Sequence, residues 1–304
     1  MLNGVVTGKL NDDISWSLEN GVLTISGYGD MPNYDETKSP FWKNLDIKEV
    51  VIKYGITAIG DSTFRFCKNL ESVTLPKSVS SIGNAAFYNC KSLVSIELPE
   101  YVQSIGDYTF YSCRSLASIK IPNKVTFIGE YAFKHCIALT AMDIPNGVVS
   151  IGTGAFESCR SLKSVFLPKS ITSIGESAFY NCKSLIYIEI PNGVSEIKDA
   201  TFYNCVSLVS VYIPQSVMSI GYSAFEACES LSSIIIPEGV STIKEAAFYG
   251  CSSVVSIVIP KSVTSIECLA FDNIDNNHTM VCTLNLYAKK HLLEEEDFSA
   301  YQFK

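Results

Sequence analysis

Apolar and polar residues alternate in short stretches that return along the chain. In one such stretch, Ile96 and Leu98 alternate with Ser95 and Glu97. A period of two predicts a short β-strand with one buried face, because successive side chains in a strand point to opposite sides. Pro99 follows directly and has no backbone N–H, so we expect the strand to end there.

This stretch belongs to a repeat of 23 residues, and each copy ends its alternating stretch with a proline. The prolines are Pro76, Pro99, Pro122, Pro145, Pro168, Pro191, Pro214, Pro237 and Pro260. The same step connects Phe64, Phe87, Phe110, Phe133, Phe156, Phe179, Phe202, Phe225, Phe248 and Phe271, and it carries a cysteine column from Cys67 to Cys251. A fixed period of this length is the sequence signature of a repeat architecture.

Each repeat also contains a stretch that favours a helical turn. Between Asn84 and Cys90, Phe87 lies three residues before the cysteine and behind the small Ala86, and Gly83 supplies a bend before them. We therefore expect strand, turn, helical turn and turn in every repeat. One unit buries too few side chains to offset the entropy lost on ordering it, so the units must stack. The pattern predicts an α/β repeat solenoid with a parallel sheet of short strands on its concave face and helical turns on its convex side.

The N-terminal end departs from the repeat, as expected where a solenoid must cover its core. Residues 14–18 and 22–26 alternate on either side of Asn20-Gly21, which is a favourable β-hairpin signal. We expect this hairpin to belong to an N-terminal cap at residues 1–46, followed by the solenoid at residues 47–271.

The C-terminal end also departs from the repeat, since the phenylalanine step stops at Phe271. Residues 272–278 read as a polar loop, 279–287 as a last strand, and 289–297 as a short charged helix. We expect these segments to form a C-terminal cap at residues 272–304.

The recurring motif A-F-x-x-C-x-x-L-x-x-[VI]-x-[IL]-P resembles the BspA-type leucine-rich repeat, and residues 20–31 are similar to the cap that often precedes such repeats. The resemblance covers nearly the whole chain. It implies a right-handed, curved leucine-rich-repeat array, a cell-surface or secreted location, and a role in adhesion to host proteins or in coaggregation between cells. The chain departs from the family where a glycine becomes Lys198, Lys244 or Glu267, where Val254 replaces leucine, and where a cysteine is missing near Lys9.

Composition narrows the functional classes. Hydrophobic residues make up 47% of the 304 residues and charged residues 18%, so a folded core is expected. The formal charge of −8 disfavours nucleic acid as a partner. No apolar run approaches the ~20 residues that span a bilayer, so no membrane insertion is expected. Residues 1–10 also lack the pattern of a signal peptide.

The polar chemistry of the chain does not indicate an enzyme or a cofactor. Nine of the 11 cysteines fall in the repeat column, where we expect buried, reduced thiols that pack as small apolar groups. Cys268 and Cys282 lie outside it, and a disulfide between them stays open beside free thiols. We expect no metal site, since the column has no C-x-x-C pair and no repeating histidine. The histidines are His135, His278 and His291, and none has a carboxylate or nucleophile placed beside it by the repeat.

Three further polar signals are weak. The oxygen-rich residues 272–277 bear a faint likeness to a calcium loop but lack its central glycine and terminal glutamate, so a solvated loop is favoured. The serines Ser72, Ser95, Ser118, Ser164, Ser210, Ser233 and Ser256 form an outward column on the strands, where we expect small surface residues and not nucleophiles. Asn277 begins a formal glycosylation sequon.

The outward strand positions indicate where a partner would bind. They are polar in the early repeats and become apolar and aromatic later, and the predicted binding residues are Phe166, Tyr187, Tyr212 and Ile235. An alternative interpretation is that exposed β-forming residues simply favour strands. Tyrosines on the expected helical side, Tyr88, Tyr111, Tyr180, Tyr203 and Tyr249, are explained by packing between neighbouring repeats.

We therefore expect non-catalytic macromolecular recognition through the concave sheet. The expected partner is a host matrix or cell-surface protein, with a glycan as a second candidate, and the chain itself is expected to be a monomer. The alternative hypothesis is a structural or self-associating surface protein with no dedicated receptor ligand.

Overall fold

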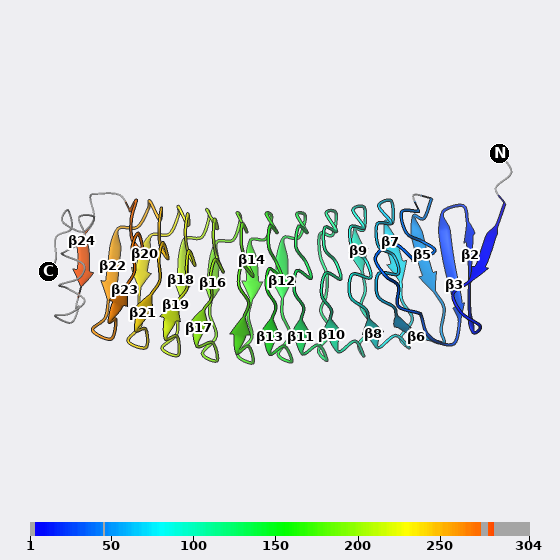
Figure 1. Cartoon of the computed structure of the whole chain (residues 1–304), viewed down its shortest axis with the longest axis horizontal. Coiled ribbons are helices and arrows are strands. Elements are labelled where there is room, and N and C mark those ends of the chain that lie inside the picture. Colours follow the sequence, from blue (N-terminus) through cyan, green and yellow to red (C-terminus); the bar gives the residue numbers. More distant parts are fainter. Residues whose placement is uncertain (1–3, 45, 275–278, 283–304) are drawn as a thin grey trace.

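The computed structural model describes residues 4–44, 46–274 and 279–282. The chain winds into an elongated stack of similar rungs, with the N-terminal hairpin at one end and the last strand at the other (Figure 1). Neighbouring rungs pair in parallel with a register of 23 residues, for example Ser164 with Tyr187 and Tyr187 with Ser210. The predicted repeat solenoid is therefore confirmed.

One side of the stack, which we call the first face, contains the strands expected from the alternating stretches. Lys120, between β9 and β12, joins this face through a parallel bridge to Glu97. The strands are β5 (Glu49–Ile52), β7 (Ser72–Thr74), β9 (Ser95–Ile96), β12 (Ala141–Asp143), β14 (Ser164–Phe166), β16 (Tyr187–Glu189), β18 (Ser210–Tyr212), β20 (Ser233–Ile235), β22 (Ser256–Ile259) and β24 (Thr279–Cys282).

A second strand in each rung forms another side of the stack, the second face, which the sequence does not predict. These strands are two residues long in most rungs and hold a single buried isoleucine, so they show no alternation. The strands are β6 (Ile56–Ile59), β8 (Ser81–Ile82), β10 (Ser104–Ile105), β11 (Phe127–Ile128), β13 (Ser150–Ile151), β15 (Ser173–Ile174), β17 (Glu196–Ile197), β19 (Ser219–Ile220), β21 (Thr242–Ile243) and β23 (Ser265–Ile266).

The third side of each rung, the turn side, is where the prediction of helical turns is wrong. Within the described residues every regular element is a β-strand. Ala85 and Asn89 have φ angles of 53° and 62°, which a right-handed helix does not allow. Their N–H groups donate to carbonyl oxygens of the next rung, Asp107 O at 2.8 Å and Tyr111 O at 2.6 Å.

The residues between these donors bond locally instead. In the same rung, Ala86 N donates to Gly83 O and Tyr88 N to Ala85 O, at 3.3 and 3.0 Å. N–H groups therefore point alternately to the neighbouring rung and back three residues along the chain. A helix would direct all of them to the residue four positions earlier, and the bonds between rungs would be lost. Stacking thus stabilises turns here in place of a helix.

The core consists of continuous side-chain columns. Eleven phenylalanine rings from Phe41 to Phe271 stack with centroids 5.1–5.7 Å apart. Phe41 extends the predicted column by one rung, and the edge of Trp16 packs against it at 5.5 Å. The aromatic core therefore continues through the residues expected to form the N-terminal cap.

The cysteine column lies beside the phenylalanine column, and its thiols donate hydrogen bonds to the phenylalanine backbone carbonyls. Each of the nine buried thiols donates to the carbonyl oxygen of a phenylalanine 26 residues earlier, at 3.1–3.3 Å. Cys90 Sγ, for example, donates to Phe64 O. A buried carbonyl without a donor is costly, so cysteine supplies a weak donor with the volume of a small apolar group. The predicted burial of this column is confirmed.

A glycine follows the second-face strand in most rungs, and close contact between rungs explains it. Asp107 Oδ1 accepts a hydrogen bond from Glu130 N of the next rung at 2.8 Å. A Cβ atom on Gly129 would lie 2.5 Å from this oxygen, which is too close. Asp61 and Asn84 accept the equivalent bonds from the rungs that follow them. Each of these side chains occupies the space that a larger residue would need.

The N-terminal strands confirm the predicted hairpin. β2 (Ile14–Glu19) pairs antiparallel with β3 (Val22–Gly27) and with β1 (Val6–Lys9). Asn20 and Gly21 both have positive φ angles, 50° and 84°, as this two-residue turn requires. β3 then pairs in parallel with β5, and β4 (Gly29–Asp30) pairs with β6. The hairpin therefore covers the first edge of the first face, and β4 covers that of the second face.

At the C-terminal end, β24 pairs with β22 in the same 23-residue register, Ser256 with Thr279. The strand expected at residues 279–287 is thus present over Thr279–Cys282. The short helix expected at residues 289–297 lies outside the described residues.

Candidate interaction surface

Two outward rows of side chains run along the first face, because most of its strands have two outward positions around one inward position. The first outward row contains Ser164, Tyr187 and Ser210, which are paired in register. The second outward row contains Phe166, Glu189, Tyr212, Ile235 and Val258 in successive rungs.

The four predicted binding residues lie on this face and are exposed. Phe166 is 60% exposed, Tyr187 48%, Tyr212 49% and Ile235 66%. They occupy four successive rungs, which at ~4.8 Å per rung span about 14 Å. We call these four side chains the apolar patch.

Glu189 lies inside the apolar patch, between Phe166 and Tyr212 in the second outward row. The Tyr187 hydroxyl donates to Glu189 Oε2 at 3.5 Å. Burial raises the pKa of the Tyr187 hydroxyl, and the Glu189 charge and hydrogen bond raise it further. The patch therefore combines an apolar surface with one carboxylate at its centre.

Sequence reasoning missed a third row that widens this patch. Ile186, Val209 and Val255 precede the strands of their rungs and are all exposed. Val258 is exposed as well and continues the second outward row beyond Ile235. The signal was present in the sequence, because Ile186, Val209 and Val255 share one repeat position just before the serine row.

The N-terminal half of the first face is different. Its second outward row holds Thr74, Glu97, Lys120 and Asp143, so it is polar and carries both signs of charge. Thr74, Glu97 and Tyr101 are among the residues that line a pocket of ≈ 390 Å³. An apolar partner that bound here would remove water from these polar and charged side chains without replacing their hydrogen bonds, which is unfavourable.

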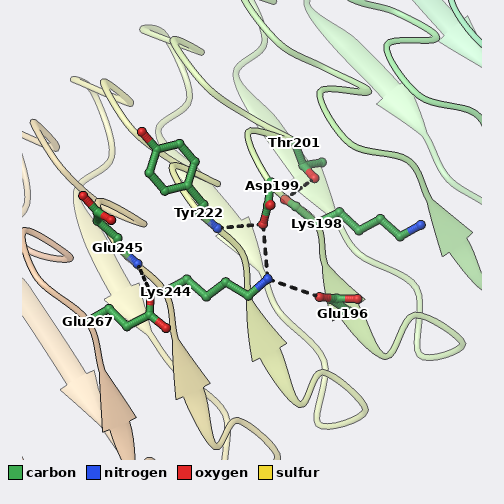
Figure 2. A network of polar contacts seen from close by, with 8 residues as sticks. All are labelled: Glu196, Lys198, Asp199, Thr201, Tyr222, Lys244, Glu245 and Glu267. Atoms are coloured by element: carbon green, nitrogen blue, oxygen red, sulfur yellow. Dashed lines mark hydrogen bonds and ion pairs between the residues drawn. The ribbon is translucent and has the colours of Figure 1, made fainter.

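The second face contains the positions at which glycine is replaced. Figure 2 shows Lys244 lying between Glu196 and Asp199, with its Nζ atom 4.0 Å from Glu196 Oε1 and 3.4 Å from Asp199 Oδ1. Asp199 Oδ1 also accepts a hydrogen bond from Tyr222 N at 2.9 Å. Polar contacts between rungs thus continue where Lys244 replaces glycine.

Glu267 makes a related contact, since its Oε2 atom accepts a hydrogen bond from Glu245 N at 3.0 Å (Figure 2). The turns that follow keep the left-handed conformation, with φ of 52° at Ala200, 55° at Ala246 and 58° at Leu269. The replacements therefore preserve the turn geometry of the repeat.

The cysteine column offers no reactive thiol. Burial raises the pKa of Cys67, Cys205 and Cys251 to about 12. The thiolate is the reactive form, so these groups are inert near neutral pH. Cys268 is exposed, and the side chain of Cys282 lies outside the described part of the chain.

Among the described residues, no group of histidine, cysteine, aspartate or glutamate side chains could hold a metal ion. His135 is half-buried, and its pKa is lowered first by burial and then by the nearby cations Lys134, Arg114 and Arg160. His278, His291 and Asn277 lie outside the described residues, as does part of the oxygen-rich segment 272–277.

The turn-side tyrosines pack against one another between rungs. Tyr88 and Tyr111 stack with centroids 4.5 Å apart, and Tyr180 and Tyr203 stack at 4.7 Å. Tyr249 accepts a hydrogen bond from Asn273 Nδ2 at 2.7 Å. These contacts confirm the packing role expected from the sequence.

Across the described ranges, we find no helix with the length and apolar character needed to cross a lipid bilayer.

Comparison with known proteins agrees with the architecture. The family model for the BspA type leucine-rich repeat region matches residues 37–163 and 149–278. No curated protein matches the chain.

Several solved structures are similar. A leucine-rich repeat protein from Eubacterium ventriosum is 26% identical, with 89% of this chain and 95% of that chain covered and a TM-score of 0.49. A leucine rich cell surface protein from Faecalibacterium prausnitzii is 22% identical, with 92% and 96% covered and a TM-score of 0.49. The pneumococcal vaccine antigen PcpA is 15% identical, with 94% and 89% covered and a TM-score of 0.54, which supports a shared fold.

Proposed function

The chain belongs to the family of BspA-type leucine-rich repeat proteins, and from this membership we propose that it is a non-catalytic recognition module. The proposed contact surface is the first face, which corresponds to the sheet expected to be concave. The proposed binding residues are Phe166, Tyr187, Tyr212 and Ile235, and the proposed partner is a protein.

The observation that carries this proposal is the gathering of exposed apolar side chains on one half of one face. Contiguous apolar surface rimmed by polar residues is characteristic of protein interfaces, and aromatic residues are enriched among the few residues that contribute most of the binding energy there. Phe166, Tyr187 and Tyr212 supply aromatic rings, and Ile186 and Val209 extend the apolar area beside them. The carboxylate of Glu189 would favour a partner with a cationic or hydrogen-bonding group opposite it.

Membership of the family also supports a proposed role in adhesion. We propose that the chain acts at a cell surface or outside the cell and binds a host matrix or cell-surface protein. The cysteine column is compatible with an oxidising environment, because its thiols are buried and their pKa values are raised.

The test is binding of the purified chain to an array of immobilised matrix proteins, cell-surface proteins and glycans. The double variant Tyr187→Ser, Tyr212→Ser should lose at least about tenfold in affinity for the bound protein. The matched control is Glu97→Ser, Lys120→Ser, which alters the same face in its polar half and leaves the net charge unchanged. The control should bind as the unaltered chain does. Equal losses in both variants, or binding to glycans alone, would contradict the proposal.

The alternative is a structural surface protein whose apolar patch contacts another copy of the chain. Exposed apolar area of this kind would also suit a self-associating surface. Sedimentation velocity over a range of concentrations separates the two hypotheses. A recognition module should keep the 33.3 kDa mass of one chain throughout. A mass that rises with concentration, and no longer rises in the Tyr187→Ser, Tyr212→Ser variant, would favour self-association.

A further inference from the structure

A row of basic residues borders the turn side of the N-terminal rungs. The position directly after each column cysteine is basic in five of six successive rungs. We call this row the basic ridge, and its members are Lys68, Lys91, Arg114, Arg160 and Lys183. Ile137 occupies the remaining position, and the ridge ends at Val206, the equivalent residue of the next rung.

The ridge is a surface feature with a fixed spacing. Lys68, Arg114, Arg160 and Lys183 are exposed, and Lys91 is partly exposed. The rungs touch directly at this position, since Ser92 N donates to Lys68 O at 3.2 Å and Ser115 N to Lys91 O at 3.1 Å. Adjacent rungs of paired backbone lie ~4.8 Å apart, so the row from Lys68 to Lys183 extends over about 24 Å.

Some cations of the described residues have carboxylate partners, whereas no ion pair is found for the ridge residues. Lys134 lies 2.9 Å from Glu157, and Lys244 lies 3.4 Å from Asp199. Within the described residues no ion pair involves a member of the ridge. Arg114 Nε donates instead to the neutral Ser112 Oγ at 3.4 Å.

The positive charges of the ridge also act near Ile137, where the row of basic residues is interrupted. His135 precedes Ile137 by two residues, and both Arg114 and Arg160 lower its pKa, after the larger effects of burial and Lys134. The cations on either side of Ile137 therefore act on the same region. A line of like charges without counter-charges is unfavourable by itself, and an anionic ligand would relieve the repulsion.

We propose that the basic ridge binds a single chain of a linear anionic polysaccharide that lies along the axis of the stack. A linear polysaccharide with one carboxylate or sulfate on each sugar presents a regular row of negative charges, which suits a row of cations repeated at every ~4.8 Å rung. Lys and Arg bind such groups through charge-assisted hydrogen bonds. The serines Ser92, Ser115, Ser161 and Ser184 follow the cations and offer hydroxyl groups to the sugars.

The geometry favours this ligand over a nucleic acid. A DNA duplex presents phosphates on two strands and needs a broad basic surface, whereas the ridge is one residue wide. A single nucleic acid strand is bound by aromatic stacking beside its phosphates. The row next to the cations consists mainly of serine and contains no aromatic residue. The proposed site is separate from the apolar patch, so it does not depend on the protein-binding function.

The experiment measures binding of the full chain to polygalacturonate and to dextran sulfate, with neutral dextran and poly(dT) as comparisons. The ridge variant is Lys91→Gln, Arg114→Gln, Arg160→Gln. The control variant is Lys77→Gln, Lys120→Gln, Lys169→Gln, which removes the same charge from exposed positions elsewhere. We expect the ridge variant to lose at least about tenfold in affinity and the control less than about twofold, with affinity falling as salt rises.

Ile137 allows a test by gain of binding. Ile137→Lys completes the row and should raise the affinity about threefold, whereas Ile137→Gln should leave it unchanged. Stronger binding to the carboxylated or to the sulfated polymer would identify the acidic group that the ridge prefers. Both substitutions are at an exposed position, so thermal melting of the variants should match that of the unaltered chain.

Three results would overturn the proposal. The first is no binding to either anionic polymer at low salt. The second is an equal loss in the ridge and control variants, which would mean that net charge alone decides binding. The third is tighter binding to poly(dT) than to polygalacturonate, which would assign the ridge to nucleic acid. Loss of protein binding in the apolar-patch variant with unchanged polysaccharide binding would support two independent sites.

Discussion

In the rungs before Phe156, the second outward row of the first face is polar, and in the rungs after it the same row is mainly apolar. Thr74, Glu97 and Lys120 occupy the first half, and Tyr212 and Ile235 the second. The backbone, the strand register and the buried side chains are the same in both halves. The difference therefore lies in the side chains that face outward.

The other faces change along the stack as well. The N-terminal half keeps glycine after each second-face strand and carries most of the basic ridge. The C-terminal half keeps that glycine at Gly175 and Gly221 but replaces it in three other rungs, by Lys198, Lys244 and Glu267. The ridge ends there, with Val206 and Glu229 at the next two positions of its row. The inward columns must be constant because each rung packs on the next, whereas the outward rows can change without disturbing the stack. The outward side chains that differ between the two halves are thus the candidates for a role in function.

The largest expected effect tests whether the two halves share one core. Phe87→Ala and Phe225→Ala each remove a fully buried ring between two stacked neighbours. Each should lower the free energy of unfolding by about 3–5 kcal/mol, and the two losses should be similar. Urea unfolding followed by circular dichroism measures both. A loss in one half that is less than half of the other would show that the cores are not equivalent.

The glycine column predicts an asymmetry between the halves. Gly129→Lys should cost about 1–3 kcal/mol, because the new side chain displaces Asp107 from its hydrogen bond to Glu130 N. The reverse change in the other half, Lys244→Gly, removes partly exposed ion pairs to Glu196 and Asp199. It should cost less than about 1 kcal/mol. Equal costs in urea unfolding would count against the explanation of the glycine by contact between rungs.

The cysteine column predicts a pH dependence shared by both halves. The pKa of Cys67 in the first half and of Cys205 in the second is about 12 in the folded chain, above the ~8.5 of an unfolded thiol. The folded thiols stay protonated to a higher pH than the unfolded ones. Their contribution to the free energy of unfolding is therefore fully present below about pH 8.5 and falls as pH rises toward 12.

Matched variants isolate this contribution from other groups that titrate at high pH. Cys67→Ala and Cys205→Ala should each reduce the fall in unfolding free energy between pH 9 and pH 10 by about 1 kcal/mol. Urea unfolding at the two pH values, with a reductant present, gives the comparison. An unchanged pH dependence in both variants would mean that these thiols ionise as readily in the folded chain as in the unfolded one.

The sequence predicts the repeat period, the first-face strands and the N-terminal hairpin of this fold. The prolines and phenylalanines set the period of 23 residues, and the alternation around Ile96 sets the first-face strands. Asn20-Gly21 predicts the hairpin because few other dipeptides adopt its two positive φ angles. These features are local, so each can be recognised within one repeat.

The parts that were missed depend on contacts between repeats. The segment from Asn84 to Cys90 has the spacing of a helical turn, but its N–H groups bond to the next rung, and that alternative exists only in the stack. The strand Ser81–Ile82 has one buried residue and no alternation to reveal it. The predicted binding residues do lie together and exposed, whereas Ile186 and Val209 belong to a row just outside the strands and were overlooked.

The most direct test of this account moves the apolar patch by three rungs, or 69 residues, toward the N-terminus. The starting point is the Tyr187→Ser, Tyr212→Ser variant, which should bind the protein partner at least about tenfold more weakly than the unaltered chain. The added changes reproduce the patch with its central carboxylate: Glu97→Phe, Ser118→Tyr, Lys120→Glu, Asp143→Tyr and Phe166→Ile. If the rungs are equivalent and the outward rows carry the function, the affinity should return to within about threefold of the original. A variant that folds normally and still fails to bind would contradict the account.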